Sequence, residues 1–241
     1  MSFKSNLINI VLVETSHPGN IGSVARAMKT MGLSKLSLVN PKDFPSGDAN
    51  ALSGNARDVL DNAIIYPSLK EAIKDSTFVY ATSSRNRSIN WPMVNPEEAA
   101  IKVIEQCKGD KEVSIIFGRE DRGLTNDELQ LANFHLEIPA NPDYPVLNIA
   151  MSVQVVTYEL FKNRSSADNK DWHDYPEINS EDLQRLIDHF VKTSIELDLI
   201  DPDNPSQIIA RIKRMFSRLQ PDSMEGNYLR GFLTAINKRL K

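Results

Sequence analysis

The chain has 241 residues, of which 41% are hydrophobic and 25% are charged, and its formal net charge is −4. This length and apolar content predict a folded, soluble protein with one large domain and an appendage, or two modest domains. One cysteine excludes an internal disulfide framework, and four histidines without neighbouring thiols show no metal-ligand spacing, so we expect no metal. No apolar run is long enough to span a bilayer, and the N-terminal residues lack a signal-peptide cleavage pattern. We therefore expect a cytoplasmic protein without a membrane partner.

Short strand-like segments rich in Val and Ile alternate with helix-like segments between residues 7 and 164. The strand-like segments lie at 8–14, 36–40, 63–66, 77–84, 113–118 and 134–140. The helix-like segments lie at 23–32, 51–60, 68–75, 96–107, 125–132 and 147–161. Capping residues three positions before a glutamate mark the starts of three helices, at Ser68, Asn95 and Thr125. The alternation predicts an α/β domain with a mostly parallel sheet and helices on both faces.

The pattern changes near residue 165, where a polar segment without periodicity is typical of a linker. Beyond it, prolines separate three amphipathic helix-like segments, at 181–199, 206–219 and 226–240. We therefore divide the chain into an α/β domain, a linker and a small helical extension, at residues 1–164, 165–179 and 180–241.

The C-terminal residues carry a positive charge that the overall composition hides. Residues 205–241 contain eight Lys or Arg and only two Asp or Glu, a net charge of +6, so the rest of the chain carries −10. A polyanion is normally bound by a positive surface, so any contact with nucleic acid has to be local. Composition alone favours the simpler interpretation, a solvated helical face.

In an open parallel sheet, ligands bind outside the carboxyl ends of the strands, so the loops that follow the strands hold the candidate site. No GxGxxG pattern follows the first strand and no GxxxxGK[ST] pattern occurs in the sequence. A dinucleotide-dependent dehydrogenase of the ordinary Rossmann type and a P-loop hydrolase are therefore both disfavoured.

The first of these loops contains Gly19 and Gly22, which permit close backbone approach, and Asn20, which either caps the following helix or has a catalytic role. Arg26 lies in that helix, where its guanidinium would suit phosphate recognition, although a lone helical arginine is more often simply exposed. In a later loop, Glu120 stands between two glycines, which favours a shaped binding loop as much as solvated surface.

Asn148 falls in the first turn of the last helix of the α/β domain, after a segment with three prolines. A proline-rich helix entry needs no ligand. Taken together, however, three motifs resemble those of the SpoU-type branch of the SPOUT methyltransferases: NxGxxxR after the first strand, FGxExxGL after a late strand and LNxAxSxxxxxYE at the start of the last helix. From residue 7 to 164 the chain is similar to the bacterial members that methylate cytidine and uridine in tRNA.

The resemblance implies an α/β fold with a C-terminal trefoil knot, S-adenosylmethionine as cofactor with S-adenosylhomocysteine as product, no metal, and a homodimer with each active site near the subunit interface. It implies that the protein methylates the ribose 2′-hydroxyl of cytidine or uridine at nucleotide 32 of the tRNA anticodon loop. It assigns Arg26 as the principal catalytic residue, with Asn20, Glu120 and Asn148 as supports. The implied cofactor contacts are Thr82, Ser83, Ser84, Gly118, Ile138, Pro145, Val146 and Leu147.

The sequence departs from the family pattern ahead of Leu147, where Pro145 and Val146 stand in place of hydroxyl residues. Backbone contacts to the cofactor survive that change, whereas a side-chain role at Val146 does not. We expect Arg26 to hold the phosphate next to the target ribose and to stabilise the developing alkoxide. A guanidinium is a poor candidate for the base because it stays protonated at neutral pH.

Four further arginines are candidates for RNA contacts: Arg85 and Arg87 beside Trp91, and Arg211 and Arg214 in the basic C-terminal segment. A solvated loop next to a buried tryptophan is the alternative for the first pair, and a dimer contact is the alternative for the second. Two other functions stay open: a methyltransferase of the same superfamily that acts on ribosomal RNA, and an RNA-binding protein that keeps the knotted fold without catalysis.

Overall fold

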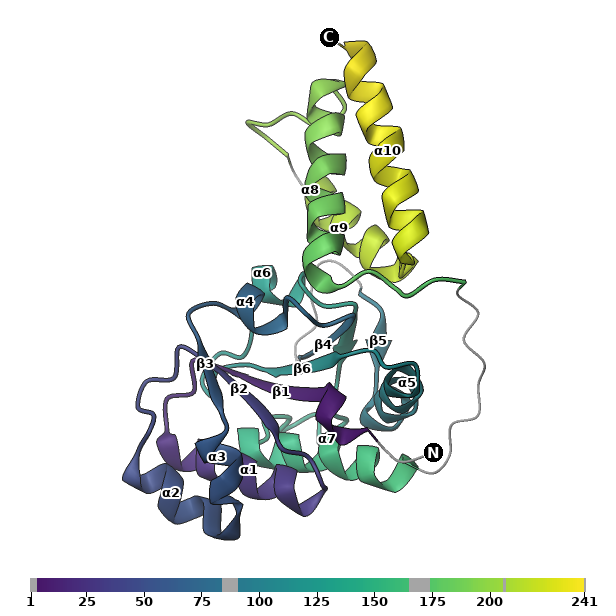
Figure 1. Cartoon of the computed structure of the whole chain (residues 1–241). Helices are drawn as coiled ribbons and strands as arrows, with labels where there is room; N and C mark the ends of the chain where they lie inside the picture. Colours follow the sequence, from purple (N-terminus) through teal and green to yellow (C-terminus); the bar gives the residue numbers. More distant parts are fainter. Residues whose placement is uncertain (1–3, 84–90, 165–173, 206, 241) are drawn as a thin grey trace.

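The computed structural model describes residues 4–83, 91–164, 174–205 and 207–240. It has two parts, an α/β unit and a group of three long helices that stands on one side of it (Figure 1).

A seven-stranded sheet forms the centre of the α/β unit, and every neighbouring pair of strands is parallel. The strand order is β3-β2-β1-β6-β4-β7-β5. The strands are β1 (Ile8–Val13), β2 (Lys35–Val39), β3 (Ile64–Tyr66), β4 (Phe78–Thr82), β5 (Met93–Val94), β6 (Val113–Phe117) and β7 (Phe134–Leu136). The mostly parallel sheet is thus confirmed. We did not predict β5, because two residues are too few to form a pattern.

Helices cover both faces of the sheet, as predicted (Figure 1). One face carries α1 (Pro18–Thr30), α2 (Gly47–Ser53), α3 (Arg57–Asp61), α5 (Pro96–Lys108) and α7 (Ile149–Asn163), and the other carries α4 (Leu69–Ile73) and α6 (Asn126–Leu129). Successive side chains of a strand point to opposite faces of the sheet, and both faces of β1 are apolar. Ile8, Ile10 and Leu12 belong to the core on the first face, whereas Val11 and Val13 belong to the core on the second.

The predicted caps are confirmed at Ser68, Asn95 and Thr125, each of which accepts a hydrogen bond from the backbone N–H of the glutamate three residues later. The single helix expected at 51–60 is wrong. The chain forms α2, a 3₁₀ turn (Gly54–Ala56) and α3 instead, and the break falls at Gly54, whose φ of 55° no α-helix accommodates.

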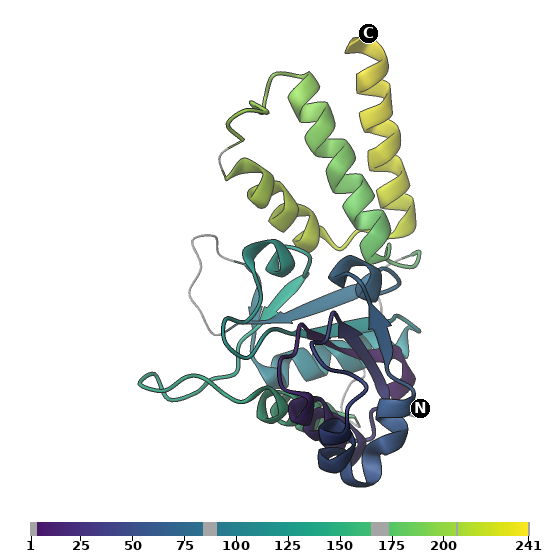
Figure 2. The same ribbon diagram turned by 90° about the vertical axis from the view of Figure 1, so that its left-hand side faces the viewer.

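The three C-terminal helices are α8 (Ser180–Glu196), α9 (Ile208–Leu219) and α10 (Ser223–Leu240), which agree with the predicted segments. They share a separate small core that includes Leu186, Ile212, Phe216 and Leu233. Figure 2 shows α8 between α9 and α10, on the side of the sheet that carries α4 and α6. The backbone N–H of Ser180 donates to the Ser76 carbonyl at 2.7 Å, so the first turn of α8 is attached to the α/β unit.

Candidate functional site

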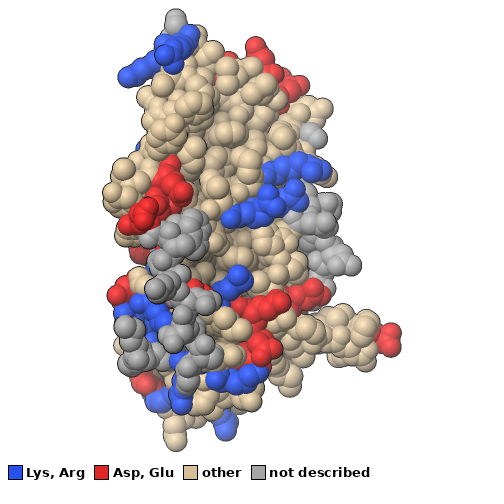
Figure 3. Space-filling model, turned by 90° about the vertical axis from the view of Figure 1, so that its right-hand side faces the viewer, with Lys and Arg blue, Asp and Glu red and all other residues tan. Residues whose placement is uncertain are grey.

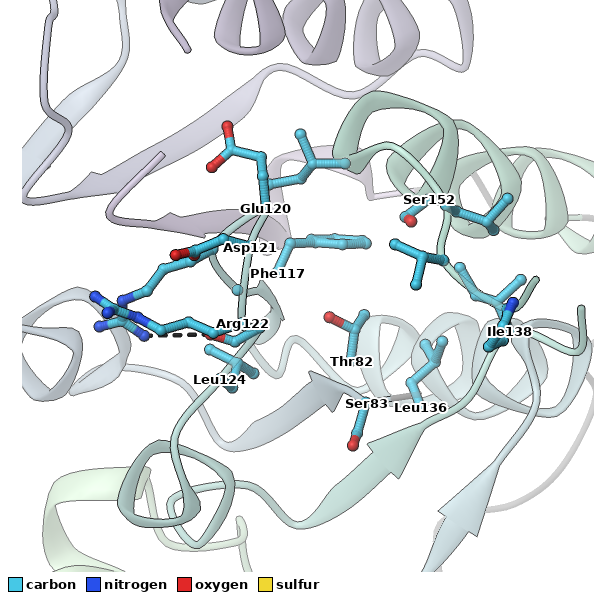
Figure 4. Close-up of a pocket in the computed structure, with 17 residues that line it drawn as sticks. Thr82, Ser83, Phe117, Glu120, Asp121, Arg122, Leu124, Leu136, Ile138 and Ser152 are labelled. Atoms are coloured by element: carbon cyan, nitrogen blue, oxygen red, sulfur yellow. Dashed lines mark hydrogen bonds between the residues drawn. The ribbon is translucent and has the colours of Figure 1, made fainter. Parts of the chain in front are cut away.

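A pocket opens at the carboxyl ends of β4, β6 and β7 (Figure 4). The chain runs from β1 to β2 and β3 on one side and then crosses to β4 on the other, so the strand order reverses beside β1. Ligands of open parallel sheets bind next to such a reversal. The pocket is lined by Thr82, Ser83, residues 117–124, Leu136, Ile138, residues 145–147, Ile149 and Ser152.

Seven of the eight residues expected to contact a cofactor line this pocket, although they come from four separate segments of the chain. They are Thr82, Ser83, Gly118, Ile138, Pro145, Val146 and Leu147. Ser84 lies outside the described residues. The side chain of Val146 is 61% exposed, in a loop where every residue from 139 to 148 is exposed. Figures 2 and 3 show this loop standing out from the α/β unit.

The loop at residues 118–124 forms a tight backbone turn. A Cβ atom at Gly118 would lie 2.4 Å from the carbonyl carbon of Gly123, and Gly123 itself has a φ of 69°. Both glycines are therefore required by the backbone path, which favours the shaped loop, one of the two interpretations that the sequence left open. Residues 118–124 all line the pocket.

Glu120 belongs to this loop, but its carboxylate points away from Thr82 and Ser83 (Figure 4). The carboxylate accepts hydrogen bonds from the Ser16 backbone N–H and hydroxyl, both at 3.1 Å, and from Asn20 Nδ2 at 3.0 Å. The His17 backbone N–H donates to it at 3.4 Å. Burial raises the pKa of Glu120, but these hydrogen bonds outweigh burial and hold the pKa below its usual value.

Asn20 and Asn148 extend the hydrogen bonds of Glu120 to α7. Asn148 Nδ2 donates to Asn20 Oδ1 at 3.1 Å, and Asn148 Oδ1 accepts from the Ala150 backbone N–H at 2.8 Å as the N-cap of α7. The suggestion that Asn20 caps α1 is wrong, since the N-cap is His17 and Asn20 lies inside the first turn. The three residues therefore join α1, the 118–124 loop and α7.

The structure does not bring Arg26 into this group. Arg26 is exposed and lines a different groove, together with Lys29, Thr30 and residues 53–56. It follows Asn20 by six positions, so the two side chains leave α1 in directions about 120° apart. In the described part of the chain, Arg26 is not among the residues that line the pocket at 118–124.

Arg119 is a residue of the site that we did not predict. Its side chain is 8% exposed and lies between two carboxylates, Glu14 just after β1 and Glu128 in α6. No local sequence pattern links positions 14 and 119, which are 105 residues apart. The only sequence feature that could have indicated a role for Arg119 is its position directly after the first glycine of the loop.

The candidate RNA contacts fall in two places. Arg85 and Arg87 lie outside the described residues. The nearby Trp91 is 7% exposed, its indole N–H donates to the Ala132 carbonyl at 2.8 Å, and its ring stacks on His135. Trp91 therefore offers no free face to a base, and its alternative interpretation as a buried residue is correct.

Arg211 and Arg214 lie in α9 with Arg218, spaced three and four residues apart. That spacing places all three on one side of the helix. Lys238 and Arg239 are exposed in the last turn of α10, and Figure 3 shows basic side chains at that tip of the molecule.

Among the described residues, no three His, Cys, Asp or Glu side chains come together in a way that could hold a metal ion. No helix in the described ranges is both long and apolar enough to cross a membrane.

Comparison with known proteins then decides the family. Residues 7–158 match the model of the SpoU rRNA Methylase family, and residues 181–241 match the C-terminal domain of tRNA methyltransferase TrmJ. The chain belongs to the SpoU methylase family. Relatives that match nearly the whole chain include TrmJ proteins. The tRNA (cytidine/uridine-2′-O-)-methyltransferase TrmJ of Pectobacterium atrosepticum is 44% identical over 234 residues, which cover 96% of this chain and 97% of that protein.

Solved SpoU structures agree with this assignment. TrmJ from Z. mobilis ZM4 superposes with a TM-score of 0.83 at 32% identity, over 95% of this chain and 98% of that one. The SpoU methyltransferase AviRb from Streptomyces viridochromogenes, solved with the cofactor AdoMet, superposes with a TM-score of 0.53 at 20% identity, over 66% of this chain and 61% of that one. AviRb shows the shared fold alone. The protein is therefore a methyltransferase with the SpoU-type α/β fold and a C-terminal helical extension.

Proposed function

We propose that this protein transfers the methyl group of S-adenosylmethionine to a ribose 2′-hydroxyl of tRNA. The observation that carries the proposal is the pocket at the carboxyl ends of β4, β6 and β7, where seven expected cofactor residues from four segments meet. Two findings favour tRNA over ribosomal RNA. The relatives that match the whole chain are tRNA methyltransferases, and the helical extension matches a domain of such an enzyme.

The residues of the pocket fit S-adenosylmethionine. Leu136, Ile138 and Leu147 provide apolar walls, while Thr82 and Ser83 bring hydroxyl groups to the same cavity. The lack of a Cβ at Gly118 lets the backbone of residues 118–124 fold back tightly beside the pocket. Bound S-adenosylmethionine would supply an electrophilic methyl group. Pro145 and Val146 line the pocket and lack hydroxyls, so any contact that they make to the cofactor's polar groups would be through their backbone.

Glu120, Asn20 and Asn148 support the site. Their side chains are used in hydrogen bonds to each other and to the backbone at residues 16, 17 and 150. We assign them to holding the 118–124 loop, α1 and the start of α7 together rather than to proton transfer.

Arg26 is proposed to bind the phosphate beside the target ribose and to stabilise the developing alkoxide. An arginine side chain has hydrogen-bond donors and no acceptor, so Arg26 is not assigned as the base. Since Arg26 does not line the pocket of its own chain, we place it in the pocket of the partner subunit of a homodimer. Tyr144, Val146 and Met151, which are 78%, 61% and 61% exposed, offer apolar surface for that dimer near the pocket. The trefoil knot remains a prediction.

Subunit complementation tests the placement of Arg26. Arg26→Ala and Gly118→Ala are each expected to inactivate the homodimer, the second because its Cβ would meet the Gly123 backbone. If the active site is shared, a heterodimer of the two variants has one intact site, and random mixing restores about one quarter of the wild-type activity. No recovered activity in a mixture shown to contain heterodimers would place Arg26 in its own subunit's site.

The acceptor is proposed to be cytidine or uridine at nucleotide 32. The basic residues of α9 and α10 are proposed to bind the tRNA. Two synthetic tRNAs that differ only by the 2′-hydroxyl of nucleotide 32 test this. Methyl transfer is expected to the ribose form and not to the 2′-deoxy form. Equal transfer to both would exclude nucleotide 32 and leave the chemistry in place.

A further inference from the structure

The Arg119 guanidinium is held by two carboxylates from distant parts of the chain. Its Nε and Nη2 donate to Glu14 at 2.8 and 2.6 Å, and its Nη1 and Nη2 donate to Glu128 at 2.9 Å each. Nη1 also donates to the Gly123 carbonyl at 3.3 Å. We call these residues, Glu14, Arg119, Gly123 and Glu128, the arginine clasp.

The clasp is electrostatically favourable although it is largely withdrawn from water. Hydrogen bonds to Glu14 and Glu128 raise the pKa of Arg119 above its usual value. The hydrogen bond from Arg119 lowers the pKa of Glu14, and it outweighs the effect of burial on that carboxyl. Burial raises the pKa of Glu128, but hydrogen bonds from Arg119 and from the Thr125 backbone N–H outweigh burial and hold the pKa below its usual value. All three groups are thus charged at neutral pH.

The clasp lies next to the pocket and connects both ends of the 118–124 loop, which forms one of its walls. Residues 117–124 line the pocket, and the clasp reaches this segment at its beginning through Arg119 and at its end through Gly123. Glycines at 118 and 123 give the segment many backbone conformations when it is unrestrained. The guanidinium of Arg119 reduces that conformational freedom, because its ion pairs connect the segment to the end of β1 and to α6.

We propose that Arg119 is a positioning residue, which holds the 118–124 loop in its cofactor-binding shape before the cofactor arrives. This inference rests on the proposed function of the pocket. A loop that is already ordered loses less conformational entropy on binding, so the hydrogen bonds of the Arg119 side chain increase cofactor affinity through the shape of the loop. Lysine at this position keeps the charge but cannot donate from a planar fork to both carboxylates.

Calorimetric titration with S-adenosylhomocysteine tests the proposal on the full-length protein. Arg119→Lys is expected to weaken binding by about tenfold, which is about 1.4 kcal/mol. Because the loop can still be ordered by bound cofactor, kcat at saturating S-adenosylmethionine and tRNA is expected to stay within about twofold, and KM for tRNA to stay unchanged.

Lys111→Met is the matched control. Lys111 is 10% exposed and pairs with Glu177, but it lies just before β6, at the end of the sheet opposite the pocket. Its loss is expected to lower the melting temperature and to leave cofactor affinity unchanged. Glu14→Gln removes one side of the clasp and is expected to give a smaller loss of affinity, so it serves as the test if Arg119→Lys does not fold.

Two results would overturn the proposal. One is wild-type affinity in the clasp variants. The other is a loss of affinity that the Lys111 control reproduces at an equal loss of melting temperature, which would assign Arg119 to general stability. If the wild-type protein itself binds no S-adenosylhomocysteine, the proposed function of the pocket fails instead, so the two failures are distinguishable.

Discussion

Replacement of Glu120 by glutamine is expected to destabilise the protein at neutral pH. The carboxylate accepts hydrogen bonds from Ser16, His17 and Asn20. Glutamine keeps one acceptor oxygen but turns an NH₂ group toward donors, so at least one of these N–H or O–H groups loses its partner. The charge at the N-terminal end of α1 is lost as well.

The expected cost follows from these contacts. Hydrogen bonds to a charged group contribute about 1.5–3 kcal/mol each, whereas neutral ones contribute about 0.5–1.5 kcal/mol. Because the side chain of Glu120 is only partly buried, we expect a net loss of about 2 kcal/mol in the free energy of unfolding. For a chain of this size, that loss lowers the melting temperature by about 4–8 °C.

The pH dependence of the effect has a defined sign. Because the folded-state pKa of Glu120 lies below its usual value, the carboxylate stabilises the fold above the unfolded-state pKa of about 4.3, and this contribution disappears as pH falls through the folded-state pKa. The difference in melting temperature between wild type and Glu120→Gln is therefore expected to be largest near neutral pH and to shrink below about pH 4.

Thermal unfolding followed by circular dichroism from pH 3.5 to 7 measures this difference. Glu98→Gln is the control, because Glu98 closes the capping box of α5 by accepting a hydrogen bond from the Asn95 backbone N–H, and neither residue lines the pocket. We expect it to cost about 1 kcal/mol or less. A Glu120→Gln protein as stable as wild type at pH 7, or a difference that does not change with pH, would refute this account of Glu120.

Three further predictions concern the pocket and the core. Gly118→Ala is expected to abolish S-adenosylhomocysteine binding in a titration, because its Cβ would lie 2.4 Å from the Gly123 carbonyl carbon; retained affinity would show that the loop can rearrange. Asn148→Ala removes the N-cap bond to Ala150 and is expected to lower the free energy of unfolding by about 1 kcal/mol in urea denaturation, and an unchanged value would contradict its capping role. Burial raises the pKa of Cys107 to about 12, so its alkylation by iodoacetamide is expected to be slow in the native protein and fast in urea, while rapid native reaction would contradict the packing of α5.

All strands except β5 were predictable, because a parallel sheet with helices on both faces requires continuous runs of apolar residues. The seven predicted cofactor residues that line the pocket were predictable for a different reason, since the motifs of the chain resemble those of a known family. Composition and spacing alone left each of Asn20, Glu120 and Asn148 with a purely structural alternative. The structure connects these three by hydrogen bonds, which no local pattern specifies.

The features that were missed or left open depend on contacts between distant segments. The Arg119 clasp joins residues 105 positions apart, and Trp91 is buried by packing on His135 and a hydrogen bond to Ala132. The break in the helix expected at 51–60 follows from the positive φ of Gly54, but a single glycine within a helical pattern does not by itself predict a break.

The proposed function is methylation of a tRNA ribose by this chain. Its most direct test supplies labelled S-adenosylmethionine with bulk tRNA and with ribosomal RNA in parallel, uses Arg26→Ala as the control, and digests each product with alkali. We expect label in tRNA, within dinucleotides that resist alkali because the 2′-oxygen is methylated, and none with Arg26→Ala. Label only in ribosomal RNA would contradict the substrate, and no label in either RNA despite cofactor binding would contradict the proposed catalysis.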